Sequence, residues 1–190
     1  RTLVLLDRGT WDPVNTALFP TAAKAIRDSG VPAVEVFFAS MQPHTDIKMH
    51  SDFTNFVLTS HLALDIPDNG KNKCRLTVGD DTKQWLNGEV TLFDTSIMHD
   101  AINESDKTRY ILMMRIWHPD LTEPERNALQ FTWDCLAIPE LVSPDPAERF
   151  MAEERVKLLH AFPEIKAKPG FGKKKSAKRK KRSGGKGFGA

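Results

Sequence analysis

The chain has 190 residues, of which 40% are hydrophobic, and this is enough for one domain with its own core. Its net charge of +2 is unevenly distributed: residues 166–190 carry eleven Lys and Arg and no acid, which leaves 16 basic and 25 acidic residues, a net charge of −9, in residues 1–165. No run approaches the roughly 18 apolar residues of a membrane-spanning helix, and two cysteines are too few for a disulfide framework.

Taken in chain order, the first predicted element is a helix within residues 14–29, helical at least from Thr21, with Gly30 as its stop. Residues 34–117 are predicted to be mostly β, because short apolar runs alternate with Gly, Asn and Asp turn signals. The strand candidates are VEVFFAS (34–40), NFVLTSHLALDI (55–66), KCRLTV (73–78), EVTLF (89–93) and RYILMMRIW (109–117).

Residues 122–161 are predicted to be helical. Thr122 and Glu125 fit a capping box, and Pro124 stands in the first turn, where its missing N–H costs nothing. A second helix is predicted over residues 146–162. Many short strands without alternating helices favour a mainly β domain, either an antiparallel sandwich or a barrel.

The composition predicts two parts, a folded domain over residues 1–165 and a Lys/Gly-rich tail over residues 166–190. The tail has too few apolar residues to offset its ordering entropy, so we expect it to be disordered. It is a solvated extension, a contact for nucleic acid or another anionic surface, or a nuclear targeting signal. Because the sequence opens on Arg1 without a signal-like segment, we expect an N-terminally truncated or processed form, and its compartment stays open.

A candidate metal site begins at His50-Ser51-Asp52. Residues i and i+2 of a strand share a face, so a His and a carboxylate at this spacing could bind one ion together. His99, beyond the predicted strand 89–93, is the candidate third ligand. Two His and one carboxylate form the facial triad of non-haem Fe(II) oxygenases. On spacing alone, the alternative is that His50 is a surface histidine in a polar loop and Asp52 a turn or cap residue.

Arg109 is the second candidate, because it opens a strongly apolar strand. An Arg that faces the interior there would need an anion, and a guanidinium binds a carboxylate through two hydrogen bonds. The alternative is an Arg at the strand edge, in water.

The order of these motifs resembles the aspartyl/asparaginyl β-hydroxylase family from about Ser40 to Leu129. The matching segments are HSDFTNF (50–56), HLAL (61–64), CRLTVGDDTKQWLNGEVTLFDTSIMHD (74–100), Arg109 and WHPDLTEPER (117–126). The second metal-binding segment, FDxSxxH, and the closing WHPDLT are the specific parts of this resemblance.

The resemblance implies a double-stranded β-helix, of the jelly-roll or cupin-like kind, with flanking helices, Fe(II) and 2-oxoglutarate. It assigns His50 and His99 to iron, and Arg109, His61 and Ser40 to 2-oxoglutarate, Ser40 across a one-residue gap. The implied reaction consumes O₂, releases succinate and CO₂, and hydroxylates a C–H bond, expected to be the β-carbon of Asp or Asn in a polypeptide.

Two positions depart from the resemblance. The animal hydroxylases have Gly where this chain has Asp52, so Asp52 could complete a triad that they lack. They also have Arg where this chain has Thr59, so more of the cosubstrate binding would depend on Arg109. The family's catalytic domain also extends further upstream.

Other residues have smaller expected roles. Asp94 either orients the His99 ring or caps its turn. His118 is expected to be structural, and Trp85 and Trp117 to be packing anchors. The alternatives for function are the same chemistry on a lipid or small molecule, or a non-catalytic jelly-roll module tethered by a nucleic-acid-binding tail.

Overall fold

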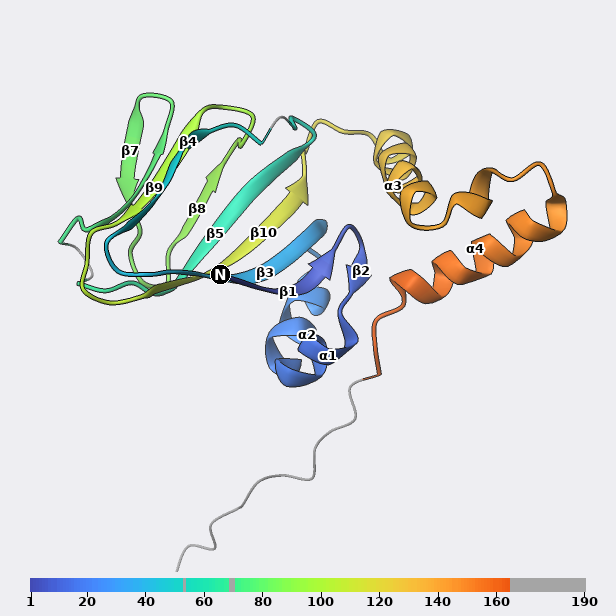
Figure 1. Cartoon of the computed structure of the whole chain (residues 1–190), viewed down its shortest axis with the longest axis horizontal. Coiled ribbons are helices and arrows are strands. Elements are labelled where there is room, and N and C mark those ends of the chain that lie inside the picture. Colours follow the sequence, from blue (N-terminus) through green and yellow to red (C-terminus); the bar gives the residue numbers. More distant parts are fainter. Residues whose placement is uncertain (53, 69–70, 165–190) are drawn as a thin grey trace, which may run out of the picture.

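The computed structural model describes residues 1–52, 54–68 and 71–164, and two antiparallel sheets dominate this part of the chain (Figure 1). The expected disorder of residues 166–190 lies outside the described residues. The major sheet has the order β2–β1–β3–β10–β5–β8, with β1 (Thr2–Asp7), β2 (Thr10–Trp11), β3 (Ala33–Met41), β5 (Val57–Asp65), β8 (Val90–Phe93) and β10 (Arg109–Trp117). The minor sheet has the order β4–β9–β6–β7, with β4 (Thr45–His50), β6 (Cys74–Val78), β7 (Asp81–Gln84) and β9 (His99–Asn103).

From β3 onward the chain alternates between the sheets. β3 lies in the major sheet, β4 in the minor, β5 in the major, the β6–β7 hairpin in the minor, β8 in the major, β9 in the minor and β10 in the major. This winding is that of a double-stranded β-helix, or jelly roll, as expected. One face of each sheet therefore points into a shared interior.

The major sheet is covered on both faces. Its inner face packs against the minor sheet through a core of Met41, Ala63, Ile66, Cys74, Leu76, Trp85, Ala101 and Ile111. Its outer face packs around Leu5, Leu6, Ile26, Val36 and Leu112, and Ile26 comes from helix α2 (Pro20–Asp28). Since alternate residues of a strand face opposite sides, β10 supplies both cores.

The predicted strands are confirmed at β3, β5, β6, β8 and β10, but β1, β2, β4, β7 and β9 were not predicted. The helix predicted within residues 14–29, at least from Thr21, is confirmed by α2. A separate short helix, α1 (Pro13–Leu18), precedes it, because Pro20 has no N–H to donate and Phe19 leaves the helical region, with φ −120° and ψ 56°.

The C-terminal helices extend away from the sheets (Figure 1). They are α3 (Glu123–Ala137), the short 3₁₀ helix η1 (Pro139–Val142) and α4 (Pro146–His160). The capping box is confirmed: the Thr122 N–H donates to the Glu125 carboxylate at 2.8 Å. His160 links α4 to the β1–β2 turn, with Nδ1 2.9 Å from the Gly9 carbonyl oxygen. No helix in the described part of the chain is long and apolar enough to cross a membrane.

Candidate active site

A cavity of about 410 Å³ opens between the two sheets. All six residues that the sequence predicted for the site line it, namely Ser40, His50, Asp52, His61, His99 and Arg109. They come from β3, β4 and the segment after it, β5, β9 and β10. Residues spread over 70 positions of sequence are thus brought to one cavity by the alternation of strands between the sheets.

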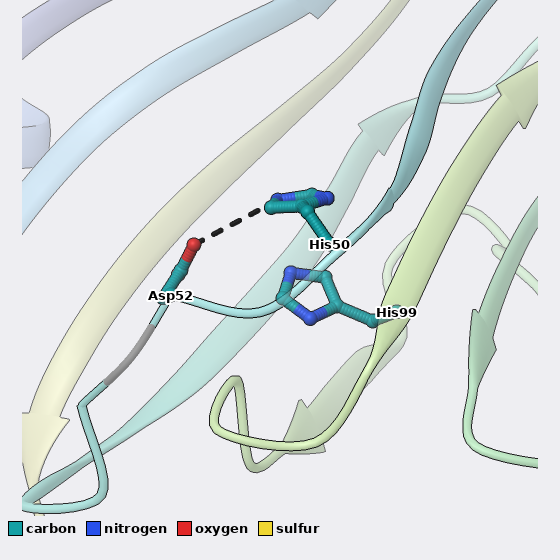
Figure 2. Close-up of side chains that lie close together, drawn as sticks. All are labelled: His50, Asp52 and His99. Atoms are coloured by element: carbon teal, nitrogen blue, oxygen red, sulfur yellow. Dashed lines mark ion pairs between the residues drawn. The ribbon is translucent and has the colours of Figure 1, made fainter.

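The register of β4 and β9 brings His50 and His99 together. Thr45–Ile47 pair with Ala101–Asn103, but His50 pairs with His99, so Lys48 and Met49 together face one residue, Asp100. This is a β-bulge, and without it Met49 would stand opposite His99. Because directly opposed residues share a face, the bulge turns His50 toward the cavity, where its ring centroid lies 4.2 Å from that of His99 (Figure 2).

Backbone carbonyls orient both imidazole rings. His50 Nδ1 lies 2.7 Å from the Lys48 carbonyl oxygen, and His99 Nδ1 lies 2.9 Å from that of Ile97. A carbonyl oxygen only accepts, so each of these bonds requires a proton on Nδ1. In the neutral ring Nε2 then keeps its lone pair, as a metal-binding histidine requires.

Asp52 lies just beyond the end of β4 rather than on the strand itself. Its backbone N–H donates to the Thr95 carbonyl oxygen at 2.9 Å, which fixes the segment beside the turn before β9. Its Oδ1 lies 3.7 Å from His50 Nε2, and the carboxylate points toward the two rings (Figure 2). One ligand atom from each of His50, Asp52 and His99 lies within 4.8 Å of the others. These residues could hold one metal ion.

Arg109, the first residue of β10, lies deep in the same cavity. Its side chain is 3% exposed, and its guanidinium carbon lies 4.3 Å from the ring centroid of Trp85. Within the described residues, Nε and Nη1 have no hydrogen-bond partner. Burial lowers the pKa of Arg109 to about 10, so the group is still charged at neutral pH. A buried cation without an anion indicates a site for an anionic ligand.

The pKa of His61 is affected by the charges of both Arg109 and His99. Burial, followed by the charges of Arg109 and His99, lowers its pKa to about 3, so the ring is neutral at physiological pH. Neither ring nitrogen has a hydrogen-bond partner among the described residues. The ring packs edge-on against Phe93 at 5.0 Å between centroids. A neutral imidazole in this position can donate one hydrogen bond to a ligand.

Ser40 lines the cavity, but its side chain does not start from the same face of the sheet as that of Arg109. It pairs with Tyr110, while its neighbour Met41 pairs with Arg109, so the Ser40 side chain starts from the opposite face of the sheet. Its Oγ lies 3.4 Å from the Arg1 carbonyl oxygen. Its assignment to 2-oxoglutarate stays a prediction.

Sequence reasoning missed Arg115, which lies in the cavity and forms a salt bridge with Asp52. Arg115 Nη1 also lies 3.5 Å from Glu35 Oε2. The signal was present in the sequence: Arg109 and Arg115 are six residues apart on one strand and therefore share a face.

The smaller predictions have mixed outcomes. Asp94 caps its turn, because its Oδ1 accepts from the Ser96 N–H at 2.8 Å, while the His99 ring uses the Ile97 carbonyl. Trp85 is buried as predicted, and it also stacks on Arg109, which was not predicted.

The sequence profile of the family described as Aspartyl/Asparaginyl beta-hydroxylase matches residues 1–119. The chain belongs to this family. Among its relatives, human Aspartyl/asparaginyl beta-hydroxylase is 34% identical over 95 residues, which cover 50% of this chain and 12% of the human protein. Mouse Aspartate beta-hydroxylase domain-containing protein 2 is 37% identical over 94 residues, 48% of this chain and 26% of that protein.

A longer match joins this chain to mouse Aspartate beta-hydroxylase domain-containing protein 1, at 28% identity over 139 residues, 69% of this chain and 38% of that protein. The chain thus spans well under half the length of these curated relatives. Among solved structures, the cupin domain of Schizosaccharomyces pombe Cnp3 aligns over 46% of this chain and 58% of that chain, with 11% identity and a TM-score of 0.38. A TM-score this low supports no argument about function, so the fold rests on the strand topology.

Proposed function

We propose that this chain is an Fe(II)- and 2-oxoglutarate-dependent dioxygenase that uses O₂, hydroxylates a C–H bond and releases succinate and CO₂. The observation that carries the proposal is the pairing of two sites in one cavity. Two imidazoles whose Nδ1 atoms contact backbone carbonyls lie at one position, and a buried guanidinium, with Nε and Nη1 unpartnered among the described residues, lies at another. A cosubstrate that binds a metal through one end and has a carboxylate at the other would use both.

In this proposal, His50 Nε2, His99 Nε2 and Asp52 Oδ1 hold the iron. The donor set fits: two neutral imidazoles and one carboxylate suit Fe(II) and leave coordination positions open. Bonds from Nδ1 to the Lys48 and Ile97 carbonyls fix the ring orientations before any ion arrives. Bound iron, with 2-oxoglutarate and O₂, supplies the oxidising chemistry.

Arg109 binds the far carboxylate of 2-oxoglutarate, and His61 donates a hydrogen bond beside it. A carboxylate would satisfy the guanidinium nitrogens that have no partner among the described residues. The Trp85 ring lies against the guanidinium and forms no hydrogen bond with its N–H groups, so these donors are left to the ligand. Ser40 is a further candidate contact at the cavity edge.

The remaining lining excludes water from the reacting centre. Leu76, Phe93, Ile111 and Met113 present apolar side chains to the cavity. An apolar wall around a charged centre strengthens its electrostatic contacts and limits side reactions with water.

The substrate proposed first is the β-carbon of Asp or Asn in a polypeptide. Its support is the family to which the chain belongs. The same chemistry on a lipid or a small molecule is the second candidate, since the cavity geometry is common to all of them. A non-catalytic binding module is the third, and the experiment below separates it from the other two.

The test is anaerobic addition of Fe(II) and 2-oxoglutarate, followed by visible absorption. The chelated pair has a weak metal-to-ligand charge-transfer band, which should form with the wild type and be lost in His99→Ala. His118→Ala is the matched control, because His118 lies outside the cavity and its Nδ1 accepts from the Asp120 backbone N–H at 3.3 Å. The control should keep the band.

Absence of the band in a folded wild-type sample would overturn the cofactor assignment and favour the binding module. A band without succinate release, when candidate peptides and O₂ are added, would leave the cofactors in place and move the search to lipids and small molecules.

A further inference from the structure

Arg115 joins two acidic residues at the mouth of the metal site. Its Nη2 donates to Asp52 Oδ2, and its Nη1 lies 3.5 Å from Glu35 Oε2. The three side chains are each about one-fifth exposed, so water screens them only in part. The family resemblance assigned no role to Arg115 or Glu35.

The two oxygens of Asp52 face different partners. Oδ2 is bound by Arg115, while Oδ1 faces His50 Nε2 at 3.7 Å. A carboxylate has about four lone-pair positions, so a guanidinium on one oxygen leaves the other free. We propose that Arg115 is a positioning residue for Asp52, which holds one carboxylate oxygen so that the other is presented to the metal beside His50 and His99. The inference rests on the proposed metal site.

The backbone alone does not fix the Asp52 side chain. Asp52 follows the end of β4, where the Asp52 N–H donates to the Thr95 carbonyl oxygen and Ser51 Oγ donates to that of Ser96. These bonds set the path of the chain but leave the carboxylate free to rotate. Among the described residues, its carboxylate forms ion pairs with His50 and Arg115.

Arg115, by contrast, stands on a rigid element. It lies on β10 between β3 and β5, directly opposite Glu35 on one side and Thr59 on the other. Glu35 anchors the guanidinium from β3. Thr59 is fully buried and small, so the neighbouring strand offers no second long side chain at this level. The major sheet therefore fixes the position from which Arg115 holds Asp52.

The alternative is that Arg115 weakens metal binding, because its positive charge would compete with the ion for the Asp52 carboxylate. The geometry favours positioning, because the two partners use different oxygens and Glu35 already offsets part of the Arg115 charge. Burial raises the pKa of Glu35 and Arg115 opposes this rise, which is consistent with a close pair. Partners that hydrogen-bond a metal ligand usually strengthen binding, and their loss costs about 10- to 100-fold in metal affinity.

The experiment measures the affinity of the full chain for Co(II) alone, by titration of its visible d–d absorption. Arg115→Met should weaken binding by about 10- to 100-fold, and Arg115→Lys should recover part of the loss, since an ammonium can still bind Asp52. Arg75→Met is the matched control, because Arg75 lies outside the cavity, where its Nη1 pairs with Glu104 Oε2 at a distance of 2.7 Å. Unchanged affinity in Arg115→Met, or tighter binding, would overturn the proposal.

A double-mutant cycle separates positioning from a general structural role. In an Asp52→Gly background, Arg115→Met should cause no further loss of Co(II) affinity, because there is no carboxylate left to hold. An equal loss in both backgrounds would mean that Arg115 acts on the fold and not through Asp52. Unfolding of each metal-free variant in urea checks folding, and Arg115→Gln replaces Arg115→Met if the latter does not fold.

The same titration distinguishes this inference from the proposed function. If His99→Ala and the wild type bind Co(II) equally weakly, the metal site itself is wrong. If the wild type binds well and His99→Ala does not, but Arg115→Met matches the wild type, the metal site stands and the role of Arg115 is wrong.

Discussion

The guanidinium of Arg109 stacks on the ring of Trp85, with 4.3 Å between the guanidinium carbon and the ring centroid. Both side chains are almost fully buried. A cation–π contact compensates part of the cost of burying the charge, but it satisfies none of the N–H donors. The donors are therefore the part of Arg109 that a ligand can use.

Arg109→Met should weaken 2-oxoglutarate binding without destabilising the ligand-free protein. Loss of hydrogen bonds to a charged group costs about 1.5–3 kcal/mol, or roughly 10- to 150-fold in Kd. The free energy of unfolding should stay equal or rise, because an apolar side chain replaces a buried charge whose Nε and Nη1 have no hydrogen-bond partner in the described part of the chain. Titration with 2-oxoglutarate in the presence of metal and urea unfolding measure the two quantities. An unchanged Kd would leave Arg109 a purely structural partner of Trp85.

Trp85→Leu should weaken 2-oxoglutarate binding more than Trp85→Phe does. Leu removes the aromatic face under the guanidinium, a contact that contributes about 0.5–2 kcal/mol. Phe keeps a face and also removes the buried Trp85 N–H, which has no partner among the described residues. Kd values for the two variants test this order. Equal Kd values would mean that the ring packs but does not orient Arg109.

His61 should make stability depend on pH. Because its pKa falls from 6.5 in the unfolded chain to about 3 in the fold, the unfolded chain binds the extra proton between these values. The free energy of unfolding should thus decrease as pH falls below 6.5, by up to about 1.4 kcal/mol per pH unit from this one group.

The comparison is between the wild type and His61→Gln in urea from pH 5 to 7. His61→Gln should flatten the dependence. Ile111→Val, a core change without a titrating group, should lower stability by the same amount at each pH. If His61→Gln keeps the full slope, His61 is not the group responsible.

Deletion of residues 166–190 should remove binding to anionic polymers while leaving succinate release unchanged. The tail carries eleven positive charges, and the rest of the chain has a net charge of −9, so we expect only the tail to attract phosphate. A fluorescent single-stranded RNA is the probe, and the affinity of the full chain should decrease steeply with salt. Equal RNA binding by the truncated chain would place the contact on the folded domain.

Much of the major sheet could be predicted from sequence, because β3, β5 and β10 are long and rich in apolar residues. The minor sheet could not, since β4 reads TDIKMH, with five exposed residues, and gives no alternating pattern. β7 is four residues long and is similarly exposed. Short strands with polar faces depend on their partners rather than on their own composition.

The features of the site also divide into those that the sequence could predict and those that it could not. His50, Asp52, His99 and Arg109 could be proposed from spacing and resemblance, and the cavity brings them together. The bulge that aims His50 depends on pairing with β9, and the contact of Arg115 with Asp52 joins residues 63 positions apart. Neither follows from local sequence, because both depend on cross-strand register.

The single strand β10 carries both cavity arginines, Arg109 at its first residue and Arg115 six residues later. At about 3.3 Å per residue, their backbones are separated by about 20 Å. The central strand thus fixes the separation between the part of the cavity that holds the Arg109 cation and the part that lies beside Asp52. Loop changes can alter what enters the cavity, but the backbone separation of the two arginines is set by the rise of the strand, which side-chain substitutions leave unchanged.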